Sequence, residues 1–369
     1  MLKAAIVGCG RIADAHASQI IGLGAHLVGV CDREPLMAQQ LSERFPARMH
    51  CSDLATLLAD ARPDVVHITT PPQTHFSIAR QCLENGCHVY VEKPFTLDTE
   101  SAAELITLAQ RLRLKVTVGH DDQFRHSARR MRRLVRDGYL GGPPVHMESY
   151  YCYDLSDPRY ARTALKTADH WVRSLPGGLL HNIISHGIAR IAEFLTGDGL
   201  SVTAHAFTSP TLQSLGENQI LDELRVLISQ HDRITAYFTF SSQMRPSLHQ
   251  FRLYGARNGL ALDQDSETLV HLTGHRHKSV LQQFIPPILL AHQHFRGFLT
   301  NVERFARSEL HPKAGLRWLI ESFYRSVLGN EPVPIPYQQI LLTSRIMDHI
   351  FHQLPAGFLQ CGTARQPLT

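Results

Sequence analysis

The sequence has no apolar run long enough to cross a membrane and no strong excess of either charge. No stretch approaches the roughly 18 uninterrupted apolar residues of a membrane span, so we expect no transmembrane helix. A formal net charge of +4 across 369 residues gives no reason to expect a nucleic-acid partner. The amino terminus runs into a glycine-rich turn without a long apolar segment, which argues against a signal peptide.

Cysteines in metal-type spacing, sequence repeats and low-complexity tracts are also lacking. The seven cysteines are odd in number, and several of them lie in apolar runs. We therefore predict reduced, mostly buried thiols in a cytoplasmic protein, and no metal site. What is present, 43% hydrophobic and 19% charged residues, is typical of globular proteins, and the length is sufficient for two domains.

The first 120 residues alternate between short apolar segments and segments of helix length. Strands are predicted at 2–7, 25–31, 65–69, 88–91 and 115–119, and helices at 11–22, 36–45, 74–85 and 99–113. Apolar strands separated by helices indicate a doubly wound parallel sheet covered on both faces, the Rossmann arrangement. We therefore predict an α/β protein with a Rossmann domain at 1–120 and a second domain at 121–369.

The first predicted strand ends in the sequence GCGRIA, which opens the first predicted helix. Glycines at such a place allow a tight turn and the close approach of a pyrophosphate, which then lies at the helix amino terminus. The strand before the motif and the helix after it are the context that a dinucleotide fingerprint requires. The cofactor-binding residues predicted here are Gly8, Gly10, Arg11 and Ile12.

The preference between NAD and NADP depends on the end of the second predicted strand, where Asp32 and Arg33 lie. A carboxylate at this place accepts hydrogen bonds from the adenine ribose hydroxyls and repels a 2′-phosphate. Asp32 therefore favours NAD as the cofactor. Arg33 is the argument for NADP, because a neighbouring guanidinium can accommodate the phosphate.

Two further segments, TTPPQTH at 69–75 and VEKP at 91–94, follow predicted strands at the same edge of the sheet. Ligands of open α/β sheets bind beyond the carboxyl ends of the strands, so a lysine there can be aimed into a cleft. The prolines of the first segment can stiffen a loop over the nicotinamide ribose, or they can simply end the strand. Both can hold at once, and we expect a structural rather than a catalytic role for His75. The cofactor contacts predicted from these segments are Thr70, Pro71, His75, Glu92 and Lys93.

Together these motifs resemble those of the Gfo/Idh/MocA oxidoreductases, the group that includes glucose–fructose oxidoreductase and inositol dehydrogenase. The most specific of them is the EKP triplet that contains Lys93. The resemblance is close over the first 120 residues and looser beyond them. It implies a second α/β domain with an open, mostly antiparallel sheet that makes homodimer or homotetramer contacts, and strand-like runs between 144 and 263 are consistent with this.

The resemblance also implies which residues carry the chemistry. It places Lys93, before a cis Lys93–Pro94 bond, at the substrate beside the nicotinamide. In LPGGLLHNIISHGIAR, residues 175–190, Asn182 takes the family's acid position and His186 its histidine position, four residues apart on one helix face. We predict that His186 is the base and that Lys93 stabilises the developing alkoxide, although the two roles can be exchanged. The Asn182 amide takes no proton and can only orient the substrate or His186.

The substrate contacts are predicted from residues 118–125, VGHDDQFR, and from the segment before the glycine pair. The first segment departs from the aromatic, asparagine and arginine pattern that the family usually carries there. Its position still implies substrate contact, with Asp121 or Gln123 holding hydroxyls, and the alternative is a linker of solvated polar residues. Trp171 and Arg173 can line the sugar site.

The leading interpretation is an NAD-dependent dehydrogenase that acts on a secondary alcohol of a sugar, an inositol or a nucleotide sugar. One alternative is a glycoside hydrolase that uses NAD without net redox change. Another is a regulator that senses the cofactor and has lost catalysis, although Lys93 and His186 are both present. The particular substrate and the direction of the reaction stay open.

Overall fold

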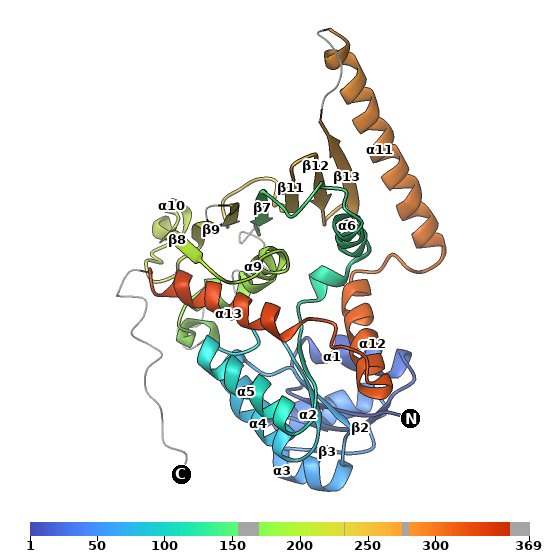
Figure 1. Cartoon of the computed structure of the whole chain (residues 1–369). Helices are drawn as coiled ribbons and strands as arrows, with labels where there is room; N and C mark the ends of the chain where they lie inside the picture. Colours follow the sequence, from blue (N-terminus) through green and yellow to red (C-terminus); the bar gives the residue numbers. More distant parts are fainter. Residues whose placement is uncertain (154–169, 232, 275–279, 355–369) are drawn as a thin grey trace. The chain divides into compact units, whose positions relative to one another are not determined.

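The computed structural model describes residues 1–153, 170–231, 233–274 and 280–354 (Figure 1). The chain divides into two compact units. The first comprises Met1–Asp121 and Leu316–Asp348, and the second comprises Asp122–Gly315 and His349–Thr369. The first unit therefore includes a segment that follows nearly all of the second unit in the sequence.

The first unit is built on a six-stranded sheet in which all neighbouring strands are parallel. The strand order is β3 (His50–Cys51), β2 (His26–Cys31), β1 (Lys3–Val7), β4 (Val65–Ile68), β5 (His88–Val91) and β6 (Val116–Val118). Almost every residue of β1, β4 and β5 is buried, as expected for strands covered on both faces. The predicted doubly wound parallel sheet is confirmed, and its strand order reverses between β1 and β4.

Helices cover this sheet, and the last two come from the late segment of the chain. They are α1 (Ala13–Gly22), α2 (Pro35–Arg44), α3 (Leu54–Thr56), α4 (His75–Glu84), α5 (Thr99–Arg111), α12 (Ala314–Gly329) and α13 (Tyr337–Phe351). Asp98 caps α5 by accepting a hydrogen bond from the Ser101 N–H at 2.7 Å. The carboxylate of Asp348 on α13 accepts hydrogen bonds from the backbone N–H and the hydroxyl of Thr99. The late helices are thus bonded to the early part of the chain.

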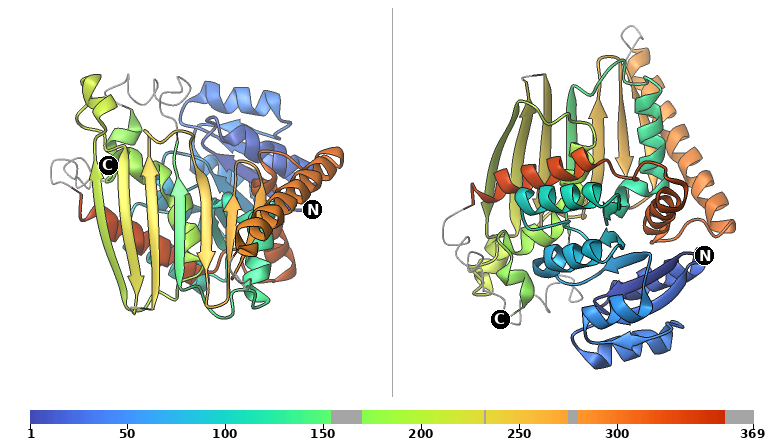
Figure 2. Two further views of the ribbon diagram at one scale, coloured as in Figure 1. Left: turned by 90° about the horizontal axis from the view of Figure 1, so that it is seen from above. Right: turned by 60° about the horizontal axis from the view of Figure 1, so that its bottom comes forward.

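The second unit contains a seven-stranded sheet, whose strands lie side by side in Figure 2. The order is β13 (Thr268–Thr273), β12 (Asn258–Asp263), β11 (His249–Tyr254), β7 (His146–Tyr151), β10 (Ile234–Ser241), β9 (Glu223–Gln230) and β8 (Leu200–Phe207). Only β7 and β10 pair in parallel, so the expected mostly antiparallel sheet is confirmed.

The two faces of this sheet differ in burial. Helix α6 (His126–Arg136) packs on β12 and β13, and α9 (Ser185–Ala192) packs on β7 and β10. On β9 and β10 the buried residues alternate with residues such as Leu227 and Tyr237, which are paired across the strands and are 43% and 53% exposed. Period-two alternation of this kind marks a sheet with one covered and one open face.

Candidate active site

The glycine-rich turn after β1 is built for close approach of the backbone. Gly8 has a φ of 95°, and a Cβ atom on it would lie 2.6 Å from the backbone nitrogen of Thr70. Only glycine fits this position, because a side chain would be strained and would clash with the backbone. A Cβ on Gly10 would meet nothing within 4 Å, so the turn borders open space on that side. The arrangement fits a pyrophosphate at the start of α1, next to Arg11 and Ile12.

Asp32 lies at the end of β2 and is held by the neighbouring backbone. Its Oδ2 accepts a hydrogen bond from the Cys9 N–H at 2.6 Å, and its Oδ1 accepts one from the Glu34 N–H at 3.0 Å. The carboxylate is therefore fixed beside the glycine turn, where the fingerprint expects a ribose partner. Arg33 is exposed. Gly8, Gly10 and Asp32 thus lie together, as a dinucleotide site requires.

Lys93 follows the last residue of β5, and the Lys93–Pro94 peptide bond is cis, as the resemblance implied. His75, at the start of α4, is fully buried and ties this turn to the loop after β4. Its Nδ1 lies 2.8 Å from the Pro94 carbonyl oxygen, and its Nε2 lies 3.0 Å from the Thr70 carbonyl oxygen. The His75 ring therefore fixes the backbone of both loops, which supports the structural interpretation of this residue.

A chain of buried side chains leads to Glu92, next to Lys93. His16 Nε2 lies 3.0 Å from Glu92 Oε1, His16 Nδ1 lies 2.9 Å from His67 Nδ1, and His67 Nε2 lies 2.8 Å from the Tyr324 hydroxyl. A carboxylate can only accept, so neutral His16 donates from Nε2 and accepts at Nδ1. His67 must then donate from Nδ1 and accept from Tyr324. This order of donors and acceptors fixes the tautomers of His16 and His67 and anchors Glu92. Glu92 Oε2 also accepts a hydrogen bond from the Lys93 N–H at 3.3 Å.

We expect acidification below about pH 6.5 to destabilise the first unit through its buried histidines. Burial lowers the pKa of His67 and of His75, and a proton on nearby His16 would lower the pKa of His67 further. At these two histidines the unfolded chain binds protons that the folded chain does not bind. The free energy of unfolding therefore falls as the pH falls, by up to about 1.4 kcal/mol per pH unit for each histidine. Denaturant unfolding between pH 7.5 and 5.5 measures this slope. The variant His67→Gln should have a shallower slope, whereas replacing the exposed His50 by Gln should not; equal slopes in all three proteins would contradict the prediction.

In the second unit, His186 on α9 is buried next to a carboxylate that the sequence did not single out. Its Nδ1 lies 3.7 Å from Asp122 Oδ2, and its ring centroid lies 5.7 Å from that of Tyr151. Asp122 Oδ2 also accepts a hydrogen bond from the Tyr151 hydroxyl at 3.0 Å and lies 3.5 Å from Arg190 Nη2. At 3.7 Å the contact is longer than a hydrogen bond, so Asp122 acts on His186 through its charge, which stabilises the cationic form that a general base acquires.

Asp122 is the centre of this cluster. Burial alone would raise the pKa of its carboxyl group, but the charges of His186, Arg190 and Arg125 outweigh burial and hold the pKa well below its ordinary value. Arg125 Nε lies 3.2 Å from Oδ1, and the Gln264 side-chain amide donates to the same oxygen. Asp122 therefore stays ionised at neutral pH and fixes the side chains around it.

Gly187 allows α9 to lie close to the sheet. A Cβ atom on Gly187 would overlap the ring of Phe238 on β10 and would lie 3.1 Å from the Cβ of Tyr151. The Ser149 hydroxyl on β7 donates to the Gly187 carbonyl oxygen at 3.0 Å. The position of His186 beside Tyr151 therefore depends on the glycine that follows it.

The variant Gly187→Ala is expected to lower the free energy of unfolding by about 1–3 kcal/mol, because the added methyl group overpacks the contact between α9 and the sheet. Thermal or denaturant unfolding measures this loss. Gly274→Ala is the matched control, since a Cβ there would meet its first neighbour only at 3.5 Å. Similar stability of the two variants would show that the close approach of α9 is not required.

The predicted substrate residues Asp121 and Gln123 lie in the short helix Asp121–Phe124, on either side of Asp122. Gln123 is buried, and its Nε2 donates to the Ala189 carbonyl oxygen and to Glu193 Oε2, both at 3.0 Å. Gln123 therefore braces α9. Asp121 belongs to the first unit and is half-buried. Their roles toward a substrate stay predictions.

The other predicted substrate residues lie near the start of α8 (Gly178–Ile183). Arg173 forms an ion pair with Glu217, with Nη2 and Oε2 2.7 Å apart, and Trp171 is half-buried against an apolar cluster that includes Leu179. Asn182 is half-buried on α8, one short helix before His186 on α9. Whether these side chains contact a substrate stays a prediction.

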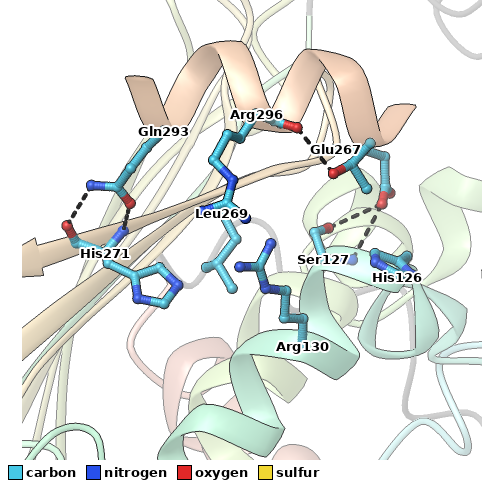
Figure 3. A pocket seen from close by; sticks show the side chains of 10 residues that line it. His126, Ser127, Arg130, Glu267, Leu269, His271, Gln293 and Arg296 are labelled. Carbon is cyan, nitrogen blue, oxygen red and sulfur yellow. Dashed lines mark hydrogen bonds between the residues drawn. The ribbon is translucent and has the colours of Figure 1, made fainter. Parts of the chain in front are cut away.

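A cavity of about 330 Å³ lies elsewhere in the second unit, between α6, β13 and α11 (Leu281–Ala306) (Figure 3). Its described lining residues include Arg130, Arg296, His126 and His271, and Glu267 is the one carboxylate among them. Glu267 Oε2 already accepts hydrogen bonds from the backbone N–H and the hydroxyl of Ser127. The lining therefore has an excess of cationic groups.

The parallel sheet, its glycine turn and the acidic residue after β2 define a dinucleotide-binding protein of the Rossmann class. Residues 2–120 match the model of the oxidoreductase family with an NAD-binding Rossmann fold, and residues 128–261 match the GFO/IDH/MocA C-terminal domain. The chain belongs to the Gfo/Idh/MocA family of oxidoreductases.

Among proteins with known functions, the chain is similar to the D-glucoside 3-dehydrogenase of Escherichia coli, with 33% identity over 142 residues that cover 38% of this chain and 40% of that protein. It is also similar to the inositol 2-dehydrogenase of Rhizobium meliloti, with 29% identity over 203 residues, 54% of this chain and 57% of that protein. The chain thus spans about half the length of the curated relatives that it matches.

Among solved structures, the chain resembles the WlbA dehydrogenase from Bordetella pertussis in complex with NADH and UDP-GlcNAcA. The TM-score is 0.75 at 16% sequence identity, and the match covers 95% of this chain and 94% of the other. At this identity the likeness establishes the fold alone.

Proposed function

We propose that this protein catalyses hydride transfer between a nicotinamide dinucleotide and a secondary alcohol of a sugar, an inositol or a nucleotide sugar. The observation that carries the proposal is the buried His186 beside the Asp122 carboxylate, whose charge stabilises a protonated base, in a chain that also has the dinucleotide fingerprint. The dehydrogenases among its relatives support the substrate class. The cofactor supplies the hydride acceptor, and the chain supplies the groups that handle the proton and the charge.

The roles of the side chains follow from their surroundings. His186 takes the hydroxyl proton, and Asp122 stabilises the imidazolium that results. Lys93, held by the turn that Glu92 and His75 anchor, donates a hydrogen bond to the developing alkoxide. We place the dinucleotide on residues 1–120 and the substrate on residues 121–369.

The first experiment is a titration of the purified protein with NAD(H) and NADP(H), followed by a screen of sugars, inositols and nucleotide sugars for absorbance change at the nicotinamide band. Turnover with one class of alcohol supports the proposal. Release of free sugar from a glycoside with no net change in NADH would support the redox-neutral hydrolase instead. Cofactor binding without turnover on any substrate would support a regulator.

NAD is the proposed cofactor rather than NADP, since the fixed Asp32 carboxylate can accept from the ribose hydroxyls. The variant Asp32→Ser should weaken NADH binding by about 10- to 100-fold, because a hydrogen bond to a charged group contributes roughly 1.5–3 kcal/mol. The variant should also reduce the difference between the affinities for NADH and NADPH. Fluorescence titration measures both affinities. Unchanged NADH affinity in this variant would remove the basis for the NAD preference.

We further propose that the protein is a cytoplasmic homo-oligomer that associates through the open face of the second sheet, where Leu227 and Tyr237 are exposed. The six cysteines that the structure describes are free thiols, which suits a reducing compartment. Among the described residues, no helix is both long and apolar enough to cross a bilayer.

A further inference from the structure

Helix α11 has an apolar face that points away from the unit to which it belongs. Its apolar residues recur at alternating intervals of three and four positions along the whole helix, which is a heptad repeat. The members of this seam are Leu281, Phe284, Ile288, Ala291, Phe295, Phe298, Val302 and Phe305. All are exposed, and the seven larger ones have exposed fractions between 47% and 73%.

The opposite face of α11 is polar and is the face that holds the helix to the sheet. Gln293 accepts a hydrogen bond from the His271 N–H at 2.7 Å and donates one to the His271 carbonyl oxygen at 3.1 Å, as Figure 3 shows. Asn301 donates to the Ser266 carbonyl oxygen at 2.7 Å. Gly297 lies close to Thr268 on β13. A surface helix usually buries its apolar side and exposes its polar side, and α11 does the reverse.

The seam is too large to be an ordinary exposed surface of a monomer. At about 200 Å² for a fully exposed aromatic side chain, the four phenylalanines alone present roughly 500 Å². The aliphatic members bring the seam toward the roughly 800 Å² that each partner contributes to a stable interface. Monomeric proteins rarely expose continuous apolar patches of more than a few hundred Å².

We propose that α11 pairs with α11 of a second copy of this chain as a two-helix coiled coil. A seven-residue repeat fits another helix with the same repeat, and a twofold interface needs the same patch on both subunits. The positions that flank the seam carry no lysine, arginine, aspartate or glutamate; among them are Ile285, His292, His294 and Leu299. Two copies can therefore meet without like-charge repulsion.

A membrane surface is the less suitable occupant of the seam. A helix that lies on a membrane combines its apolar face with a polar face rich in lysine and arginine that remains in water. The charged side chains of α11 are Arg296, Glu303 and Arg304, and Arg304 is buried beside Glu267, 3.7 Å away. The exposed charges of the helix are thus one arginine and one glutamate, too few for the cationic face of a helix that lies on a membrane.

Sedimentation equilibrium of the full chain at micromolar concentration tests the pairing. The variant Phe298→Glu places a charge in the seam of both copies and should raise the dissociation constant by about a hundredfold or more, halving the mass of the particle. The mass should be halved whether the parent protein is a dimer or a tetramer. The control Leu289→Glu changes an exposed apolar residue of the same helix outside the seam and should keep the parent mass. Both variants should have the circular dichroism of the parent.

Several results would overturn the pairing. These are a parent chain that is monomeric, a Phe298→Glu variant with the parent's mass, or equal dissociation of both variants. The parent chain could instead be monomeric and float with vesicles of anionic phospholipid. If the Phe298→Glu variant then lost vesicle binding, the seam would be assigned to a membrane surface.

Discussion

Replacing Lys93 by methionine is expected to reduce kcat by about 10²- to 10³-fold while the affinity for NADH changes little. Methionine keeps the unbranched chain and removes the ammonium group, so the developing alkoxide loses a charged hydrogen-bond donor. Removal of one such donor corresponds to roughly 3–4 kcal/mol of transition-state stabilisation. Stopped-flow or steady-state absorbance of NADH measures kcat, and fluorescence titration measures the cofactor affinity.

The matched control for this variant is Lys3→Met. Lys3 begins β1, at the opposite end of the strands from the turn after β5, and its ammonium donates to the Arg62 carbonyl oxygen at the surface. This control should keep the parent's kcat. If Lys93→Met kept kcat as well, Lys93 would be a surface lysine that opens a loop. If it lost NADH binding and turnover together, its role would be in the cofactor site.

The parallel sheet could be predicted because its strands carry their signal locally. Strands β1, β4 and β5 are continuous apolar runs, and each is followed by a helix of ordinary length. Strand β3 has only two residues, His50–Cys51, which is too short for any pattern to appear in the sequence. Strand β13 mixes threonines and a histidine with its apolar residues, and it was not predicted.

The association of the late helices with the first unit could not be predicted, because it depends on single polar contacts across long sequence separations. The Tyr324 hydroxyl on α12 reaches His67, and Asp348 on α13 reaches Thr99. Helix periodicity indicates that these segments have a buried face, but it does not identify the surface that covers them. The series of side-chain contacts from Tyr324 through His67 and His16 to Glu92 could not be predicted for the same reason.

In the candidate site, too, the sequence did not show which side chains lie next to each other. The motif around His186 identified the histidine, but no carboxylate was predicted to lie next to it, and the structure places Asp122 beside the ring. Adjacent residues of a short helix point in different directions, so the sequence HDDQ does not say which aspartate faces His186. One signal was available: Arg190 lies four residues after His186 on the same helix face, and two such groups indicate a buried carboxylate nearby.

Replacing Asp122 is the second change with a large expected effect, which concerns stability as well as activity. The variant Asp122→Asn is expected to lower the free energy of unfolding by about 3–5 kcal/mol, because it leaves the guanidinium of Arg190 and the neighbouring cationic groups without the charge that compensates their burial. His186 also loses the group that stabilises its cationic form, so kcat should fall. Asp265→Asn is the control: Asp265 pairs with His249 but is exposed, and such pairs contribute about 0–1 kcal/mol.

The pH dependence separates this electrostatic effect from a general loss of packing. The pKa of Asp122 is lowered in the folded protein, so its contribution to stability is fully present above the unfolded value of about 3.9 and is lost as the pH falls through the folded value. The difference in unfolding free energy between the parent and Asp122→Asn should therefore persist down to about pH 4 and should narrow only below it. Chemical denaturation at each pH measures this difference. A constant difference down to the lowest pH at which the parent folds would show that the cost comes from packing around the amide, and that His186 does not depend on the charge of Asp122.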